Sequence, residues 1–253
     1  MIWKAVLSLL LMSASLTADL QQAYQKYQQA EHTRDEEERK KLFNEALTFY
    51  LQAEPKHPSG LYYYNMANTY FQLGQYGYAI LYYYKAQKLL GHDDRVAANL
   101  AISLQKAEVV QPNTSFIHRI FVEPFSYVTF SHNQKVVIVL LFLFLAFAFY
   151  SLYIWSPSAV WCRPSALFCF VVGLAFTCSL VWSEFLSPPE AILVRATPVR
   201  VDAGMQYAPV ADALSLPGMK VEIISVEKNG AWVKIRLPSG REGFVAQEYV
   251  RLI

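Results

Sequence analysis

The chain has 253 residues, a formal net charge of +2 and a hydrophobic content of 54%. This nearly balanced charge, with no basic stripe and no base-stacking motif, argues against nucleic acid as a partner. The three cysteines, Cys162, Cys169 and Cys178, all lie in or beside one apolar run and form neither a CxxC motif nor a metal-ligand spacing. The sequence therefore predicts no metal, no cofactor, no thioredoxin-like redox site and no disulfide in the soluble segments.

Residues 1–18 have the layout of a secretory signal peptide. Lys4 is followed by the apolar run 5–12 and by small residues at 13–15, with a cleavage point near Ala18. An uncleaved anchor is the alternative, because Leu16 does not suit the cleavage signal. Either reading exports the segment that follows, so we expect the soluble parts outside the cytoplasmic membrane.

Residues 19–110 predict an all-α domain of helical repeats. Within the window 60–93, small and large side chains recur at helical spacing on two helices that are separated by a glycine turn: Tyr63, Met66, Ala67 and Tyr70, then Gly74, then Ala79, Tyr83 and Ala86. Asn99 follows Asn65 after 34 residues, and the charged run 34–41 is interpreted as a solvated helical face. The window resembles the tetratricopeptide repeat, which implies a helical solenoid of about two and a half repeats.

The resemblance to tetratricopeptide repeats implies a concave surface built by the first helix of each pair. Such a surface binds an extended peptide or a partner helix. The peptide-binding residues predicted in this way are Leu61, Tyr64, Asn65, Asn68, Phe71 and Asn99. Paired amides at Asn65 and Asn99 would hold a peptide backbone; the alternative is that asparagine is simply common at this position of such repeats.

Two uncharged apolar runs, 136–155 and 164–183, dominate the second half of the chain. Each has about 20 residues, enough for a helix to cross the roughly 30 Å hydrocarbon layer. We predict an antiparallel transmembrane hairpin whose short loop carries Cys162 outside the lipid; a pair of buried core helices is the alternative. The preceding segment, 111–134, is predicted to be an amphipathic connector in the membrane interface or under the last repeat.

From residue 188 to residue 253 the hydrophobic period changes from 3.6 to 2, which predicts a small all-β barrel. The expected strands are 191–194, 199–201, 220–226, 231–237 and 243–246. The series Pro217-Gly218, Trp232 and Gly243-Phe244 resembles the bacterial SH3 domain, with Phe244 where that family usually has tryptophan. The resemblance implies binding of cell-wall peptides or a spacer role, and Trp232 is interpreted as core rather than as a ligand platform.

The whole order of segments resembles the BatE family of the Bacteroides aerotolerance operon. That resemblance implies a non-enzymatic scaffold in the bacterial inner membrane, with two passes and both soluble domains on the periplasmic side. The implied partners are membrane lipid and other envelope proteins, some with von Willebrand factor A-type domains, acting in oxidative-stress or aerotolerance complexes. A peptidoglycan-binding anchor that acts through the SH3-like barrel is the alternative function.

Overall fold

The computed structural model describes residues 19–53, 58–110, 130–156, 158–210, 215–227 and 229–253. The predicted signal peptide and most of the predicted connector lie outside these residues. One compact unit holds the N-terminal helices and the C-terminal strands, and a second holds two long apolar helices. The N-terminal helices, the strands and the apolar helices are described separately below.

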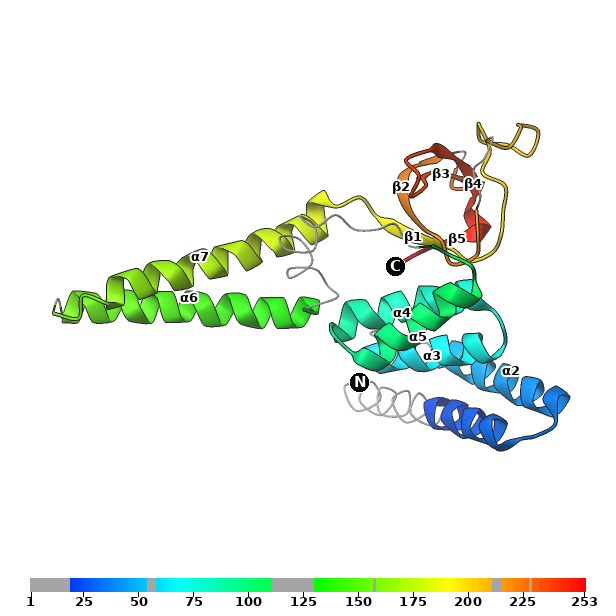
Figure 1. Ribbon diagram of the computed structural model, residues 1–253, viewed down its shortest axis with the longest axis horizontal. Coiled ribbons are helices and arrows are strands. Elements are labelled where there is room, and N and C mark those ends of the chain that lie inside the picture. The colour runs from blue at the N-terminus through cyan, green and yellow to red at the C-terminus, as the bar shows by residue number, and fades with distance from the viewer. Residues whose placement is uncertain (1–18, 54–57, 111–129, 157, 211–214, 228) are drawn as a thin grey trace, which may run out of the picture. The chain divides into compact units, whose positions relative to one another are not determined.

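The N-terminal part consists of successive helices (Figure 1). A helix covers residues 19–32 and is called here the first helical segment; it is followed by α2 (Glu36–Gln52), α3 (Gly60–Gln72), α4 (Tyr76–Leu90) and α5 (Asp94–Lys106). Asp35 caps α2 by accepting a hydrogen bond from the Glu38 amide (2.9 Å), and the charged turns after it are exposed. The charged run therefore forms a solvated helical face, as its sequence predicts.

Small and large side chains alternate in the helical core. Its buried members include Ala46, Tyr50, Met66, Ala67, Tyr70, Ala79, Tyr83 and Ala86. Tyr70 stacks on Tyr82 with ring centroids 5.3 Å apart, and the Tyr62 hydroxyl donates to the backbone oxygen of Tyr50 (2.8 Å). Gly74 ends α3 with a φ of +72°, a conformation that glycine adopts without strain. The predicted turn and helical faces are confirmed except at Tyr63, which is half-buried, while its neighbour Tyr62 is buried.

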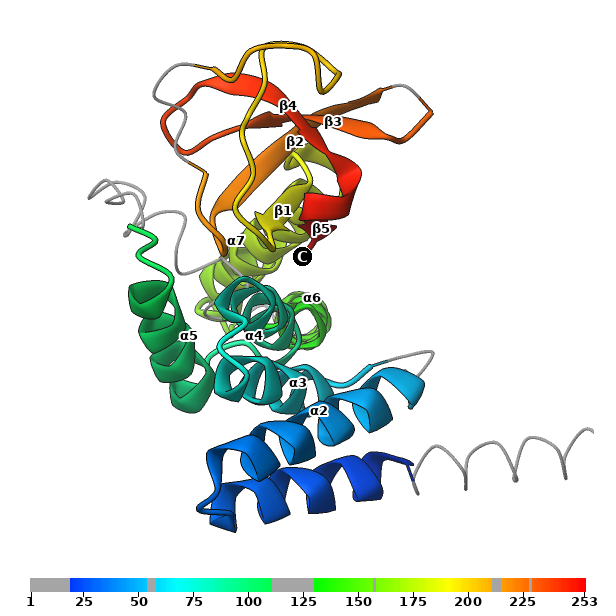
Figure 2. The same ribbon diagram turned by 90° about the vertical axis from the view of Figure 1, so that its right-hand side faces the viewer.

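The two apolar helices, α6 (His132–Trp155) and α7 (Cys162–Val181), lie side by side and are long and apolar enough to cross a membrane (Figures 1 and 2). Only 6% and 17% of their most apolar stretches are buried inside the structure, which disfavours the alternative of buried core helices. A Cβ on Gly173 would lie 3.3 Å from the Leu143 side chain, so glycine permits the close approach of α7 to α6. A short π-helix, Trp182–Leu186, follows α7.

The ends of the hairpin differ from the sequence-based expectation. α6 begins four residues early because Ser131 and Gln134 form a reciprocal cap, in which the Ser131 amide donates to Gln134 Oε1 (2.8 Å). Lys135 Nζ donates to Ser179 Oγ across the two helices (3.2 Å). Cys162 is the first residue of α7, and its side chain is fully buried. The expectation of an accessible Cys162 thiol in the loop was therefore wrong.

The C-terminal part is a five-stranded antiparallel sheet in the order β4-β3-β2-β1-β5 (Figure 2). Its strands are β1 (Glu190–Leu193), β2 (Lys220–Glu227), β3 (Trp232–Arg236), β4 (Glu242–Ala246) and β5 (Val250–Leu252). A register shift in β2 between Ile223 and Ser225 bends the sheet. Its buried core comprises Ala191, Leu193, Val199, Val221, Val233, Ile235, Leu237, Val245 and Val250.

Two details of the sheet correct the prediction. Residues 199–201 form no strand; Arg200 instead exchanges two backbone hydrogen bonds with Phe244, each 2.8 Å long, as an isolated bridge. The last strand, β5, pairs with β1 and was not among the expected strands. A three-residue strand carries too little periodicity to be recognised from sequence.

Candidate functional site

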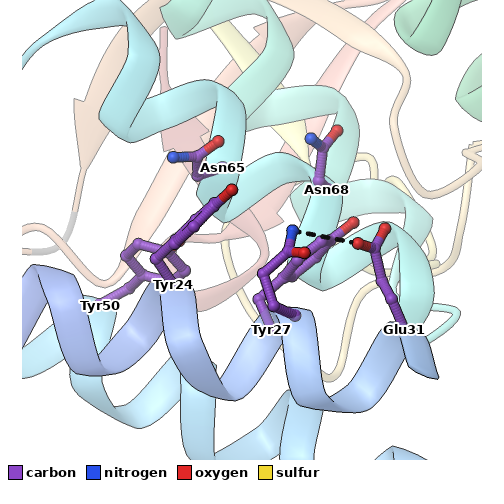
Figure 3. Close-up of a pocket in the computed structure, with 7 residues that line it drawn as sticks. Tyr24, Tyr27, Glu31, Tyr50, Asn65 and Asn68 are labelled. Atoms are coloured by element: carbon purple, nitrogen blue, oxygen red, sulfur yellow. Dashed lines mark hydrogen bonds between the residues drawn. The ribbon is translucent and has the colours of Figure 1, made fainter. Parts of the chain in front are cut away.

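A cavity of about 190 Å³ opens between the first helical segment, α2 and α3 (Figure 3). It is lined by Tyr24, Tyr27, Gln28, Glu31, Tyr50, Asn65 and Asn68. The residues from the first helical segment follow i, i+3, i+4, i+7 spacing, which places them on one helical face. Tyr24 points from this helix towards Asn65 on α3 (Figure 3).

Tyrosine rings form the wall of the cavity. Tyr27 packs edge-on against Phe43 with centroids 5.3 Å apart, and Tyr50 packs edge-on against Tyr62 at 6.1 Å. Tyr24 differs because 54% of its surface is exposed. The cavity thus has a packed aromatic floor and one solvent-exposed ring at its rim.

The polar groups near the open end surround one carboxylate. Gln28 Nε2 donates to Glu31 Oε2 at 3.2 Å, the hydrogen bond drawn in Figure 3. Burial raises the pKa of Tyr27 well above its usual range, and the negative charge of Glu31 beside the phenol raises it further. At neutral pH Tyr27 is therefore a neutral donor that faces an acidic group.

The two amides of α3 are held differently. Asn68 Oδ1 accepts from the Tyr83 hydroxyl (2.6 Å) and from Asn99 Nδ2 (3.1 Å), which fixes the orientation of its amide. Among the described residues, the Asn68 Nδ2 group and the whole Asn65 side chain make no hydrogen bond; the Asn65 backbone oxygen accepts from Thr69 (2.9 Å). The cavity therefore presents amide groups that are free to bind a peptide backbone.

Two of the six predicted binding residues line the cavity, and Tyr64 and Asn99 are joined to one of these, Asn68, by hydrogen bonds of Asn99. Asn65 and Asn68 line the cavity. Asn99 lies behind them, because its Nδ2 group donates to the Tyr64 hydroxyl (3.1 Å) as well as to Asn68. Asn65 and Asn99 therefore have different surroundings despite their equivalent sequence positions. Leu61 is half-exposed outside this cavity, and Phe71 packs against Tyr76 with centroids 5.6 Å apart.

Five lining residues were missed by the sequence-based prediction: Tyr24, Tyr27, Gln28, Glu31 and Tyr50. Tyr24 and Tyr27 resemble packing residues of a degenerate repeat helix, and Tyr27 does pack against Phe43, although it is only half-buried. Tyr24 does not, since more than half of it is exposed. The helical spacing of Tyr24, Gln28 and Glu31 was the available signal, because together they form a polar and aromatic stripe.

The buried tyrosines make the helical part sensitive to alkaline pH. Burial raises the pKa of Tyr50 to about 12, with a smaller effect from Tyr24, and raises those of Tyr70 and Tyr83 beyond the usual range. A raised pKa in the folded state gives stability that is fully present below pH 10 and is lost as pH rises through 12.

We expect each such tyrosine to lower the free energy of unfolding by about 1.4 kcal/mol per pH unit within this interval. Circular dichroism and tyrosinate absorbance, recorded between pH 9 and 12 (about one unit below the ordinary pKa up to the raised one), would follow the loss together. Tyr50→Phe should make the loss less steep. Full ionisation near pH 10 with unchanged helix content would contradict the burial of these phenols.

The outward face of β3 and β4 is a second surface of interest. Because strand residues alternate, burial of Val233 and Ile235 turns Trp232 outwards, where it is half-buried. The interpretation of Trp232 as core was therefore wrong. Nearby, Arg236 pairs with Glu242 (2.8 Å) and Glu222 (3.1 Å), and hydrogen bonds from Arg236 and then Lys234 lower the pKa of Glu242. These charges are exposed and largely satisfy one another.

Other chemistry is sparse in the described part of the chain. Within those residues no three His, Cys, Asp or Glu side chains are placed to hold a metal ion. A wider apolar hollow of about 690 Å³ lies on the helical hairpin. It is lined by Leu143, Ala146, Phe147, Tyr150, Arg163, Pro164, Ala166, Leu167 and Phe170. Its surface suits lipid or another apolar helix and offers no set of reactive groups.

Comparison with known proteins identifies one domain. Neither the curated proteins nor the solved structures gave a match to this chain. Residues 195–251 do match a family model, and this range contains β2, β3, β4 and the first two residues of β5. The match indicates, at a coarse level, a role in binding peptidoglycan or protein. The C-terminal part of this chain is a bacterial SH3 domain.

Proposed function

We propose that the protein is a membrane-anchored envelope scaffold that captures an extended segment of a partner protein in the groove of its N-terminal helices. The observation that carries the proposal is the cavity where the Asn65 side chain and the Asn68 Nδ2 group, which have no hydrogen-bond partner among the described residues, lie beside tyrosine rings. Peptide backbones need donors and acceptors of this kind, and aromatic rings bury the side chains between them. The 34-residue offset from Asn65 to Asn99 supports a tetratricopeptide-type array.

The apolar surface of α6 and α7 supports the membrane anchor. Phe144, Phe147 and Phe168 are each at least 65% exposed, among many other apolar side chains of the two helices. A soluble protein rarely exposes so large an apolar patch, whereas a bilayer covers it without cost. An antiparallel pair returns the chain to the side from which it came. The helical part and the barrel are therefore proposed to share one face, outside the cytoplasm.

The physiological setting follows from the BatE-like order of segments. We propose envelope complexes related to aerotolerance, with partners that include proteins bearing von Willebrand factor A-type domains. A scaffold of this kind needs no catalytic group, and we propose no enzymatic activity. The groove selects the partner, while the hairpin holds the complex at the membrane.

Peptide capture is tested by comparing two asparagine-to-alanine variants of the full chain in detergent micelles. Asn65→Ala removes the unpaired amide, whereas Asn44→Ala removes an exposed amide on α2 that donates to the Lys40 backbone oxygen (2.9 Å). The probe is a pool of random dodecapeptides. We expect Asn65→Ala to weaken retention about three- to tenfold, as the loss of one or two hydrogen bonds predicts, and Asn44→Ala to have no effect. Equal retention by both variants would contradict the proposal.

A second function is favoured by the match to the bacterial SH3 domain. The outward Trp232 and Phe244 on neighbouring strands offer an aromatic surface on which a cell-wall stem peptide would pack. In this alternative the barrel is a peptidoglycan anchor. Sedimentation of residues 188–253 with purified wall sacculi tests it. If the wild-type segment pellets with the sacculi and the Trp232→Ala variant does not, the anchor function is supported. If the wild-type segment stays in the supernatant, the anchor function is rejected.

A further inference from the structure

The cavity at the N-terminal helices has an uneven charge. Its lining contains one carboxylate, that of Glu31, and no lysine, arginine or histidine. The other lining groups are neutral: tyrosine rings, one glutamine and two asparagines. A ligand group that enters this cavity therefore meets a negative charge with no positive charge beside it.

The negative charge of Glu31 has no cationic partner among the described residues. Its carboxylate accepts a hydrogen bond from Gln28 Nε2, which is a neutral donor, and it lies near the neutral phenol of Tyr27. Glu45, on the neighbouring helix α2, shows the contrast because it pairs with Lys26 at 2.7 Å. Glu31 thus lines the cavity as an exposed carboxylate without a cationic side chain paired to it in the described part of the chain.

The tyrosines add a second preference for a cation. An aromatic ring attracts a positive group to its face, and three tyrosines line the same cavity as Glu31: Tyr27 lies beside it, and Tyr24 and Tyr50 lie farther along the cavity (Figure 3). The protein already uses such contacts nearby, since Arg95 lies over the Tyr64 ring at 5.7 Å. The side-chain oxygen of Asn65 is a further acceptor for N–H groups.

We propose that this cavity binds an arginine or lysine side chain of the captured partner segment. The inference deepens the proposed peptide-binding function and rests on it. The aliphatic part of the side chain packs against Tyr24 and Tyr50, and the cationic end pairs with Glu31. Acidic segments are excluded because their carboxylates would face Glu31 without a cation between them.

The test uses four dodecapeptide libraries and the full chain in detergent micelles. One central position is fixed as Arg, Lys, Gln or Glu, and the other positions are randomised over uncharged residues. We expect the Arg and Lys libraries to bind about tenfold more tightly than the Gln library, which corresponds to about 1.4 kcal/mol from an ion pair and a cation–π contact together. The protein has a net charge of +2, which repels basic peptides, so non-specific electrostatic attraction to the whole protein cannot produce this preference.

Three variants separate the cavity from general charge effects. Glu31→Gln should bring the basic libraries to the level of the Gln library, and Glu31→Lys should make the Glu library the best ligand. Glu36→Gln is the matched control, because it removes an exposed carboxylate that pairs with Lys40 at 2.9 Å and does not line the cavity. Circular dichroism confirms that the variants keep their helices.

The possible outcomes distinguish the binding of a basic side chain from peptide capture in general. Equal binding of all four libraries, or a basic preference that survives Glu31→Gln, overturns the inference and leaves peptide capture intact. Binding of none of the libraries above empty micelles overturns peptide capture itself, and the inference with it.

Discussion

Replacing Tyr83 with alanine is expected to lower the free energy of unfolding of the helical part by about 3–5 kcal/mol. Tyr83 is only 1% exposed and is the largest fully buried side chain among the described residues. Its ring packs against Tyr64 with centroids 6.1 Å apart, and its hydroxyl donates to Asn68 Oδ1 (2.6 Å). The substitution therefore leaves a cavity and also loosens an amide that lines the groove.

Urea unfolding of the full chain in detergent micelles, followed by circular dichroism, measures this loss because the hairpin helices remain folded in the micelle. Tyr83→Phe keeps the ring and should cost only about 1 kcal/mol, the net value of one hydrogen bond. Tyr24→Ala removes an exposed ring and should cost about 0.5 kcal/mol or less. A small effect of Tyr83→Ala, equal to that of Tyr24→Ala, would show that the helices do not pack around Tyr83.

The second large effect is expected in the C-terminal sheet, where Gly243→Ala should lower the free energy of unfolding by about 1–3 kcal/mol. A Cβ at this position would lie 2.5 Å from Val199 Cγ1 and 2.7 Å from the Arg200 backbone oxygen. The segment around Arg200 would have to move away from β4. That movement would break the two backbone hydrogen bonds between Arg200 and Phe244.

Gly240→Ala is the control for this prediction. No atom lies within 4 Å of a Cβ at Gly240, so its cost comes only from a φ of +81°. Thermal unfolding of residues 188–253, with Val199→Ala added to each variant, separates the two causes. Val199→Ala should partly relieve Gly243→Ala and leave the cost of Gly240→Ala unchanged. If Gly243→Ala and Gly240→Ala cost the same, and if each adds independently to the effect of Val199→Ala, then the 199–201 segment does not pack against β4.

Much of the fold follows from local patterns in the sequence. The helices around Met66 and Tyr83 have apolar side chains at 3.6 spacing, and the strands around Val221 and Val233 alternate. The long apolar runs give α6 and α7 by length alone. In each case the pattern or length of a single segment predicts its secondary structure, so contacts with distant segments are not needed.

Some of the errors come from contact between segments far apart in the chain, and others come from local detail at the ends of helices and strands. Arg200 pairs with Phe244 across more than forty residues, and a bridge of this kind has no local period. Cys162 is polar enough for a loop but is buried as the first residue of α7. The groove shows the same limit: Asn65 and Asn68 were identified from one helix, whereas Tyr24 and Glu31 join them only after the helices pack.

We propose that a membrane hairpin holds both soluble parts on one face, outside the cytoplasm. Thiol labelling in a background of Cys162→Ala, Cys169→Ala and Cys178→Ala tests this topology. Three single exposed positions report on the helical part, the loop and the barrel, namely Lys41→Cys, Ser158→Cys and Ser239→Cys.

A membrane-impermeant maleimide is applied to intact spheroplasts and again after permeabilisation. We predict labelling of positions 41 and 239 in intact spheroplasts and labelling of position 158 only after permeabilisation. The reverse pattern would invert the protein and remove the periplasmic location. Positions 41 and 239 on opposite sides, or position 158 labelled together with both, would contradict the hairpin itself.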